Sequence, residues 1–390
     1  MRTISFMELF AGCGGFSQGF LAFRLPGAAR SPFRLVGAIE SDNVAAATFA
    51  SNFGKEFDTG KQMLVRDIEY CEAPAYGAVD VMLGGPPCQG FSGLGKRNVD
   101  DPRNKILFEY LRFIQAGAPG IFVIENVDRF MQSPEYTVLL ESTERGGPLQ
   151  DYVLESQIMN AADYGIPQTR RRAIILGTHR DLIYSHPQSR PLKHPIPTHG
   201  KRVSSEMASL FEGYGTSPWV SVSSIFKKTS YYPIKSELPD YICAPLGTQL
   251  PGTFKTRELH VGRRATALSM ERYTLIPPGG NRHNLPPHLS TLNWVSFRHG
   301  AGDVFGRMAM DRPAVTIRTE FFKPEKGRYL HPWEHRPITH YEAALIQGFP
   351  DDFLWCGGKI QIARQIGNAI PVQLSTVIAR EIYSYLRAVG

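Results

Sequence analysis

One cysteine, Cys88, follows two glycines and two prolines in the stretch GGPPCQGFSGLGKRN. Proline fixes φ, so Pro86 and Pro87 hold the backbone ahead of the thiol in a single conformation. The glycines beyond it allow residues 90–98 to close as a lid that carries Lys96 and Arg97. A thiolate held in this way could attack an electrophilic carbon. Taken alone, the short sequence PPCQ is also consistent with a buried cysteine before a loop.

A carboxyl group and several guanidinium groups stand at the ends of other apolar runs. Glu125 and Asn126 end the run IFVIEN, and Arg170, Arg171 and Arg172 lead into the run AIILG. Consecutive strand residues point to alternate faces, so at least one arginine should face a site at this edge. In place of a catalytic role, Glu125 could be a helix N-cap or a buried hydrogen-bonding group. The three arginines could likewise form a cluster on the surface. A thiol, an acid and a guanidinium together suit nucleophilic addition at C6 of a pyrimidine, which makes C5 carbanion-like when N3 is protonated or hydrogen-bonded.

A glycine loop follows the first apolar run, in ELFAGCGGF. Gly12, Gly14 and Gly15 permit a sharp turn into a helix whose amide groups can face a ligand. Glu40 ends the next run, where a carboxylate can bind both hydroxyls of a ribose, and Asp67 and Ile68 follow a further loop. The spacing departs from Gly-x-Gly-x-x-Gly, so the loop favours a nucleoside-containing cofactor other than a nicotinamide dinucleotide. Without the acidic residues, a tight turn with no ligand would be as good an interpretation.

The composition is that of a globular protein in a reducing compartment. The chain has 390 residues, of which 42% are apolar and 20% charged. It has no apolar run long enough to cross a bilayer and no signal-peptide pattern, so we expect a cytoplasmic protein. Its five cysteines are dispersed, with no Cys-x-x-Cys pair, which argues against a disulfide framework and a structural zinc, and we expect no metal.

The positive charge is concentrated in the middle of the chain. Residues 181–330 carry 20 Lys and Arg against 11 Asp and Glu, whereas the rest carries 23 against 25. A basic surface that neutralises phosphates supplies most non-specific affinity for nucleic acid. The distribution therefore favours a nucleic-acid partner, although a basic solvated surface would give the same count.

The first 180 residues alternate apolar runs with helical patterns, as in parallel βαβ units with helices on both faces of the sheet. The predicted strands are Ile4–Phe10, Leu35–Ile39, Val79–Leu83, Ile121–Ile124 and Ala173–Leu176, and the predicted helices are Phe16–Phe23, Asn43–Phe53 and Lys105–Ala116. Near the C-terminus, Leu374, Ile378, Ile382 and Tyr385 form one helical stripe.

The pattern changes near residue 185, where a segment rich in Pro, His and basic residues reads as a linker. We expect a catalytic and cofactor-binding domain over 1–185, a smaller, irregular, β-rich domain over 186–338, and a hinge with a C-terminal helix over 339–390 that returns to the first domain.

Six motifs in this order resemble the DNA (cytosine-5) methyltransferase family of the bacterial restriction-modification type: FAGCGGF, GGPPCQGFS, ENV, NAADYGIPQTRRR, RPAVTIRT and QGFPDDF…QIGNAIPV. The resemblance implies a Rossmann-like α/β fold, S-adenosylmethionine as cofactor and a flipped cytosine in double-stranded DNA as substrate. It also implies that the unmatched basic segment, about 186 to 310, is the target-recognition region.

The resemblance implies a role for each matching residue. Cys88 would be the nucleophile, Glu125 would hold N3 and the exocyclic amine, and Arg172, supported by Arg170, would hold O2. The residues implied to bind the cofactor are Phe10, Gly12, Gly14, Gly15, Phe16, Glu40 on the ribose, Asp67 on the adenine amine, Ile68, Pro87, Leu107, Asn368 and Ala369. Those implied to contact DNA are Gln89, Ser92, Lys96 and Arg97, while Arg312 and Thr316 would organise the recognition domain.

Three other functions fit part of the pattern. A transfer RNA cytosine-5 methyltransferase would share the chemistry, but the chain lacks the Cys-Phe-Thr run of that subgroup and has a large basic second domain. A non-catalytic DNA-binding relative would not need the cysteine, acid, arginine and cofactor loop together. A nicotinamide oxidoreductase is disfavoured by the glycine spacing. We expect a bacterial or phage-encoded monomer that protects DNA from a partner restriction endonuclease.

Overall fold

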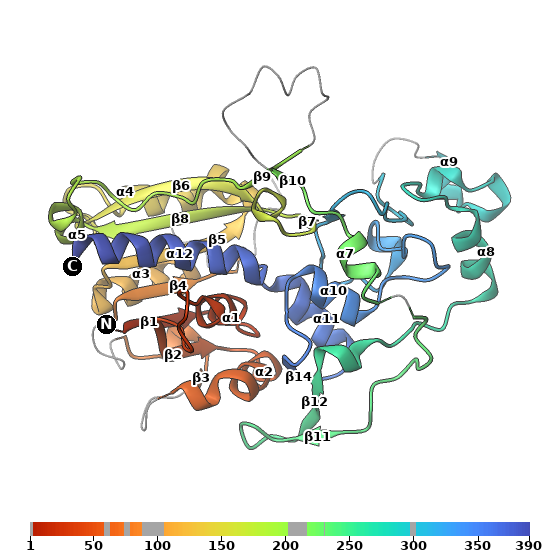
Figure 1. The fold of residues 1–390 in the computed structure, drawn as a ribbon, viewed down its shortest axis with the longest axis horizontal. Coiled ribbons are helices and arrows are strands. Elements are labelled where there is room, and N and C mark those ends of the chain that lie inside the picture. The colour runs from red at the N-terminus through yellow and green to blue at the C-terminus, as the bar shows by residue number, and fades with distance from the viewer. Residues whose placement is uncertain are drawn as a thin grey trace, which may run out of the picture. The chain divides into compact units, whose positions relative to one another are not determined.

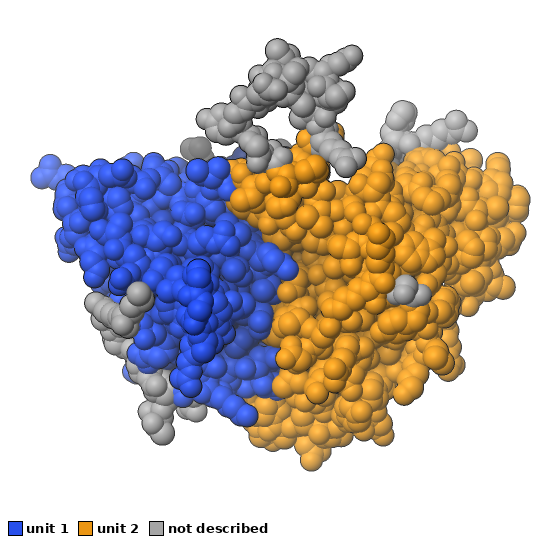
Figure 2. Space-filling view, in the orientation of Figure 1, with its two compact units in different colours: residues 1–160, 171–196, 372–390 blue, residues 161–170, 197–371 orange. Residues whose placement is uncertain are grey.

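The computed structural model describes residues 3–57, 63–73, 79–87, 105–201, 217–229, 231–296 and 302–390. They form two compact units (Figure 2). The first unit contains residues 1–160, 171–196 and 372–390, and the second contains 161–170 and 197–371. Each unit is therefore assembled from separate stretches of chain. The functional division at residues 185 and 338 remains a prediction, while the packing places residues 186–196 in the first unit.

The first unit is an α/β fold around one seven-stranded sheet with the order β3-β2-β1-β4-β5-β8-β6 (Figure 1). The strands pair in parallel except β8, which is antiparallel to both of its neighbours. The strands are β1 (Ile4–Leu9), β2 (Phe33–Glu40), β3 (Met63–Val65), β4 (Val81–Gly84), β5 (Ile121–Val127), β6 (Tyr152–Asn160) and β8 (Arg171–His179). All five predicted strands are confirmed.

Helices cover both faces of this sheet, because successive residues of its strands point to opposite faces and both sets of side chains are apolar. On one face Phe6 of β1 lies 5.2 Å, ring centre to ring centre, from Phe20 of α1 (Gly15–Ala22). On this face α1 packs against α12 (Val372–Val389), and the Ser375 hydroxyl donates to the Phe16 carbonyl at 2.9 Å. The four predicted stripe residues of α12 are buried there, Leu374, Ile378, Ile382 and Tyr385. Figure 1 shows α12 running along the sheet.

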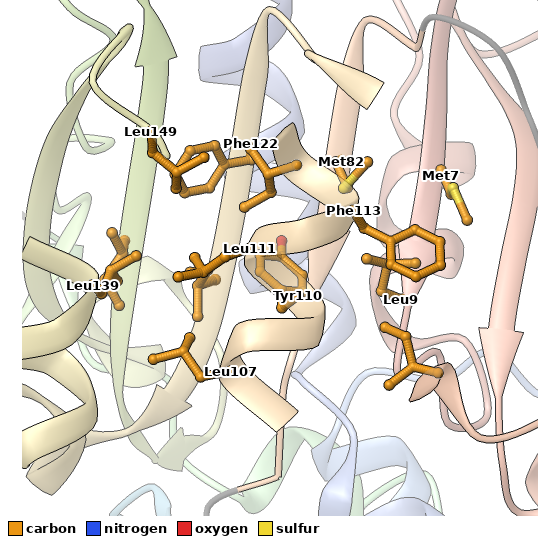
Figure 3. Packing of buried hydrophobic residues seen from close by; sticks show 14 of the residues in the cluster. Met7, Leu9, Met82, Leu107, Tyr110, Leu111, Phe113, Phe122, Leu139 and Leu149 are labelled. Atoms are coloured by element: carbon orange, nitrogen blue, oxygen red, sulfur yellow. The ribbon is translucent and has the colours of Figure 1, made fainter. Parts of the chain in front are cut away.

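The opposite face packs on α3 (Lys105–Gly117) and α4 (Pro134–Glu141) (Figure 3). Alternate strand residues Met7, Leu9, Met82 and Phe122 contact the apolar side of α3 in one cluster. The Tyr110 hydroxyl donates to the Val123 carbonyl at 2.9 Å, which satisfies its polar end inside the core. A further helix, α2 (Asn43–Phe53), follows β2 and is capped by Asp42. The three predicted helices of this unit are confirmed.

The second unit is irregular in its described part. Its helices are α7 (Ser223–Phe226), α8 (Ala267–Leu275), α9 (Leu292–Ser296), α10 (His340–Ile346) and α11 (Lys359–Asn368), and its strands are β7 (Gln168–Thr169), β9 (His199–Gly200), β10 (Ser217–Pro218), β11 (Ile242–Cys243), β12 (Leu250–Lys255), β13 (Ala314–Val315) and β14 (Leu354–Cys356). Within the described part of residues 186–338, where a β-rich domain was expected, the α-helices α7, α8 and α9 contain slightly more residues than the strands β9 to β13, so the β-rich character is not observed there. Each of these strands has only two to six residues, and Pro or Gly lies within or next to several of them.

Buried arginines bind the loops of this unit together. Arg307, 2% exposed, donates to the main-chain carbonyls of Tyr273, Ile276, His331 and Glu334. Long loops leave such carbonyls without strand partners, and a guanidinium with five donors can serve several of them. Side chains thus supply hydrogen bonds that sheets would supply elsewhere. No helix in the described ranges has the length and apolar character needed to span a membrane.

Candidate active site

The glycine loop after β1 contacts the end of β2 in the first unit. The Gly12 N–H donates to Glu40 Oε2 at 2.7 Å, and the Asp42 N–H donates to Glu40 Oε1 at 2.8 Å. Burial raises the pKa of Glu40, and these hydrogen bonds oppose the rise. The carboxylate that was predicted to bind a ribose is therefore fixed by main-chain donors at the carboxyl edge of the sheet.

Two glycines of this loop are required for different reasons. Gly12 has φ +54° and a Cβ there would meet no atom within 4 Å, so the backbone faces open space. Gly14 has φ +92°, and a Cβ there would lie 2.3 Å from the Phe53 ring. Gly14 is thus needed for packing against α2, whereas Gly12 leaves room for a ligand to approach the main chain.

Glu8, a buried carboxyl group under the loop, was not among the predicted site residues. It is 2% exposed and accepts hydrogen bonds from the Ser17 N–H at 3.0 Å and from the Ser17 hydroxyl. Burial raises its pKa to about 8, and the hydrogen bonds from Ser17 only partly oppose this. Its signal in the sequence was a carboxylate inside an otherwise apolar strand.

Glu8 should make the stability of the protein depend on pH. Its pKa is about 8 in the fold against an ordinary 4.5, so between these values the folded state holds a proton that the unfolded state has lost. Stability should therefore fall as pH rises from about 5 to 8, by up to about 1.4 kcal/mol per pKa unit. Glu8→Gln is neutral at every pH and should flatten this decrease. Chemical denaturation of both proteins at several pH values measures the difference, and parallel curves would contradict the assignment.

The remaining predicted cofactor residues of the first unit line the same edge or the core beneath it. Asp67 is exposed and accepts from the Glu69 N–H at 3.1 Å, and Ile68 is buried beside it. Phe10, with φ 55°, stacks on Tyr110 with ring centres 6.3 Å apart. Phe16 and Leu107 are each 4% exposed, so they belong to the core beneath this edge and present little surface to a ligand.

An ion pair connects β5 and β8 next to this edge. Arg172 Nε lies 2.8 Å from Glu125 Oε1, and the two side chains are 14% and 13% exposed. Gly85, just beyond β4, packs on this carboxylate: a Cβ there would lie 3.3 Å from Glu125 Oε2. The acid and the guanidinium predicted for the site are therefore together, one strand from the segment that leads to Cys88.

Several predicted residues lie beyond the described part of the chain. Pro86 is buried and Pro87 is exposed, and Pro87 is the last described residue before Lys105. Cys88, the predicted nucleophile, and the predicted DNA contacts Gln89, Ser92, Lys96 and Arg97 fall in the undescribed range 88–104. Their roles remain predictions.

The three consecutive arginines alternate as expected. Arg171 is exposed and Arg172 is half-buried, whereas Arg170 is 1% exposed and belongs to the second unit. Its guanidinium donates to the Ile317 and Gly367 carbonyls, both at 2.9 Å. These contacts place the Arg170 guanidinium between main-chain carbonyls of the RPAVTIRT and QIGNAIPV motifs, and the supporting catalytic role expected for Arg170 remains a prediction.

Other motif residues of the second unit belong to the same hydrogen-bonded set, whereas the predicted residues Arg312 and Asn368 are exposed. Gln168 Nε2 donates to Gln347 Oε1 at 2.8 Å, and Gln347 Nε2 donates to the Ala369 carbonyl at 3.1 Å. Thr316 Oγ1 donates to the Thr169 carbonyl at 3.1 Å. Asn368 ends α11, and Ala369 follows it. The motif residues thus organise the interior of this unit.

This arrangement and the sequence together define a protein class. A family model described as C-5 cytosine-specific DNA methylase matches residues 4–384. The chain belongs to this family and is a DNA (cytosine-5) methyltransferase.

The chain is similar to several curated bacterial enzymes over nearly its whole length. Type II methyltransferase M.DdeI from Desulfomicrobium norvegicum is 29% identical over 413 residues, which cover 99% of this chain and 90% of the relative. Type II methyltransferase M.XorII from Xanthomonas oryzae pv. oryzae is 30% identical over 395 residues, which cover 98% of this chain and 85% of the relative.

The fold also has solved relatives. A crystal structure described as a DNA modification methyltransferase encoded within an E. coli prophage matches with a TM-score of 0.64 and 22% identity, over 98% of this chain and 99% of that one. At this identity the likeness shows the fold, an S-adenosylmethionine-dependent methyltransferase fold with a mostly parallel mixed sheet.

Proposed function

We propose that this chain transfers a methyl group from S-adenosylmethionine to C5 of a cytosine flipped out of duplex DNA, through a covalent bond between Cys88 Sγ and C6. The observation that carries the proposal is the Glu125–Arg172 pair at the carboxyl edge of the sheet. This pair lies beside the strand that leads through Pro86 and Pro87 to Cys88.

The residues around the glycine loop fit S-adenosylmethionine. The open space in front of Gly12 allows close approach, and both Glu40 oxygens are fixed by main-chain donors yet keep lone pairs for two ribose hydroxyls. Asp67 would accept from the adenine amine, and Phe10, Phe16 and Ile68 would supply apolar surface. When bound, S-adenosylmethionine supplies an electrophilic methyl group and leaves as a neutral thioether.

The protein's own groups would act on the cytosine ring. The Cys88 thiolate forms the S–C6 bond while the C5–C6 π electrons move to C5, and Glu125 supplies a proton or hydrogen bond at N3. After C5 has taken the methyl group, a general base or water removes the C5 proton. That electron pair restores the C5–C6 double bond, the S–C6 bond breaks, and the thiolate is regenerated.

Arg172 would serve this step in two ways. Its Nε fixes Glu125, and its remaining donors could bind the O2 atom of the cytosine. We assign Arg170 to positioning, because its buried guanidinium holds main-chain carbonyls of two motifs.

The substrate we propose is duplex DNA, bound mainly by the basic second unit. Flipping a base costs a few kcal/mol, which phosphate contacts and closure of the chain after Cys88 would offset. The Type II names of the relatives support a place in a restriction-modification system, with a partner endonuclease cutting the unmodified site.

The proposal is tested by transfer of labelled methyl groups from S-adenosylmethionine to duplex DNA and, in parallel, to transfer RNA. We expect 5-methylcytosine in DNA, and we expect the Cys88→Ser variant to produce none. Label in transfer RNA alone would keep the chemistry and overturn the substrate. DNA binding without label in either nucleic acid would favour a non-catalytic relative.

A further inference from the structure

The pairing of β4 with β5 stops at a defined point. The last paired residues are Gly84 and Ile124. Beyond Gly85, Pro86 and Pro87 have no N–H group, so β4 cannot continue the ladder. The buried Pro86 residue therefore needs a donor for its carbonyl from elsewhere, since a buried carbonyl without a hydrogen-bond partner is destabilising.

The Asn126 side chain supplies that donor. Its Nδ2 donates to the Pro86 carbonyl at 3.0 Å, and its Oδ1 accepts from the Val127 N–H at 2.8 Å. Asn126 is 5% exposed and belongs to β5. With both ends of the amide bonded, its orientation is fixed, and it attaches the proline turn to β5 where the main-chain ladder has ended.

The neighbouring residue on the same strand is Glu125. Glu125 is held by Arg172 from the β8 side, while Asn126 holds Pro86 on the β4 side. The acid proposed to bind N3 and the turn leading to the proposed nucleophile are therefore fixed to consecutive residues of one strand. A single cytosine must meet both groups, so their spacing has to be kept.

We propose that Asn126 is a positioning residue for the nucleophile. By donating to the Pro86 carbonyl it holds the Pro86-Pro87 turn, so that the thiol of Cys88 can reach C6 of the ring whose N3 is bound by Glu125. This inference rests on the function proposed above. A displacement of about 1 Å in such an arrangement can reduce a rate about 10²-fold.

The test is the isosteric Asn126→Asp variant. It keeps Oδ1 for the Val127 N–H but replaces the Nδ2 donor with an oxygen that faces the Pro86 carbonyl. We expect single-turnover methyl transfer to slow by about 10- to 100-fold. Affinity for S-adenosylmethionine should fall by a smaller factor than the rate, because Pro87 is the one predicted cofactor residue in this turn and the Gly12–Glu40 contact is made elsewhere in the unit.

A second readout detects the attack of the thiol without methyl transfer. Exchange of the C5 hydrogen of the target cytosine with solvent, measured with S-adenosylhomocysteine in place of the methyl donor, requires the S–C6 bond to form. We expect it to slow by the same factor. Asn52→Asp is the matched control: Asn52 Nδ2 also donates to a main-chain carbonyl, that of Thr48 at 2.8 Å, but within α2. It should leave both rates unchanged.

Three results would overturn the inference or its basis. Unchanged exchange and transfer in Asn126→Asp would show that the contact does not position the thiol. Loss of cofactor affinity and of thermal stability in parallel with the rates would show a merely structural role. If the unmutated protein neither methylates DNA nor exchanges the C5 hydrogen, the proposed function fails first.

Discussion

Glutamine in place of Glu125 should slow methyl transfer by about 10²- to 10⁴-fold, the range for losing a general acid or base. Glutamine is nearly isosteric and can still hydrogen-bond, but it cannot deliver a proton to N3 and no longer attracts Arg172. The two side chains are mostly buried with Nε and Oε1 2.8 Å apart, so solvent cannot readily substitute for the lost charge. Single-turnover transfer of labelled methyl groups to DNA measures the effect.

A second ion pair, between β8 and the residue that follows β5, offers a matched control. Arg171 Nε lies 3.5 Å from Asp128 Oδ2, but these side chains are 61% and 42% exposed. Asp128→Asn makes the same chemical change as Glu125→Gln in a solvated pair and should alter the rate by less than about twofold. Equal losses in both variants would assign the effect to local destabilisation and argue against Glu125 as the acid.

Methionine in place of Arg336 should destabilise the second unit by about 3–5 kcal/mol, the usual cost of leaving a buried charge without its partner. Arg336 is 3% exposed and donates to both oxygens of Glu342, at 2.9 and 2.7 Å, while Glu342 is fully buried. Glu342 also closes a capping box with Thr339 at the start of α10. Denaturation monitored by the tryptophans of this unit measures the loss.

The pH dependence separates this explanation from a simple loss of packing. Burial alone would raise the pKa of Glu342, but the hydrogen bonds and charge of Arg336 outweigh it and hold the pKa below its ordinary 4.5. In the wild-type protein this contribution is complete above that value and is lost as pH falls through the lower, folded pKa. In Arg336→Met the Glu342 carboxyl group can become protonated, so the loss of stability should shrink as pH falls towards about 5.

Adding Glu342→Gln to Arg336→Met should restore most of the stability, whereas Lys323→Met, which breaks an exposed pair, should have little effect.

The sheet of the first unit could be predicted because its central strands are buried on both faces and read as continuous apolar runs. Two strands were not predicted. Strand β3 has three residues, and β6, with the sequence YVLESQIMN, is an edge strand in which Glu155 and Gln157 interrupt the apolar pattern. The second unit resisted prediction because side-chain contacts distant in sequence, such as those of Arg307, determine its loops.

The site was predictable where residues end strands. Glu40, Glu125 and Arg172 follow or begin apolar runs, so the topology brings them to one edge. The hydrogen-bond partners of Arg170 could not be predicted, because the carbonyls of Ile317 and Gly367 are far away along the chain. Asn126 was visible beside Glu125, but its role depends on the Pro86 carbonyl, which only the register of β4 and β5 reveals.

The place of α12 in the first unit has a consequence for the order of biosynthesis. The helix that packs against α1 comes after residues 1–371, so the ribosome must release both earlier parts of the chain before this face of the sheet can be covered. Until then Phe23, at the end of α1, lacks its contact with the Tyr383 ring of α12, so nascent chains should depend on chaperones. The first unit therefore cannot be completed before residues 197–371 of the second unit have been synthesised.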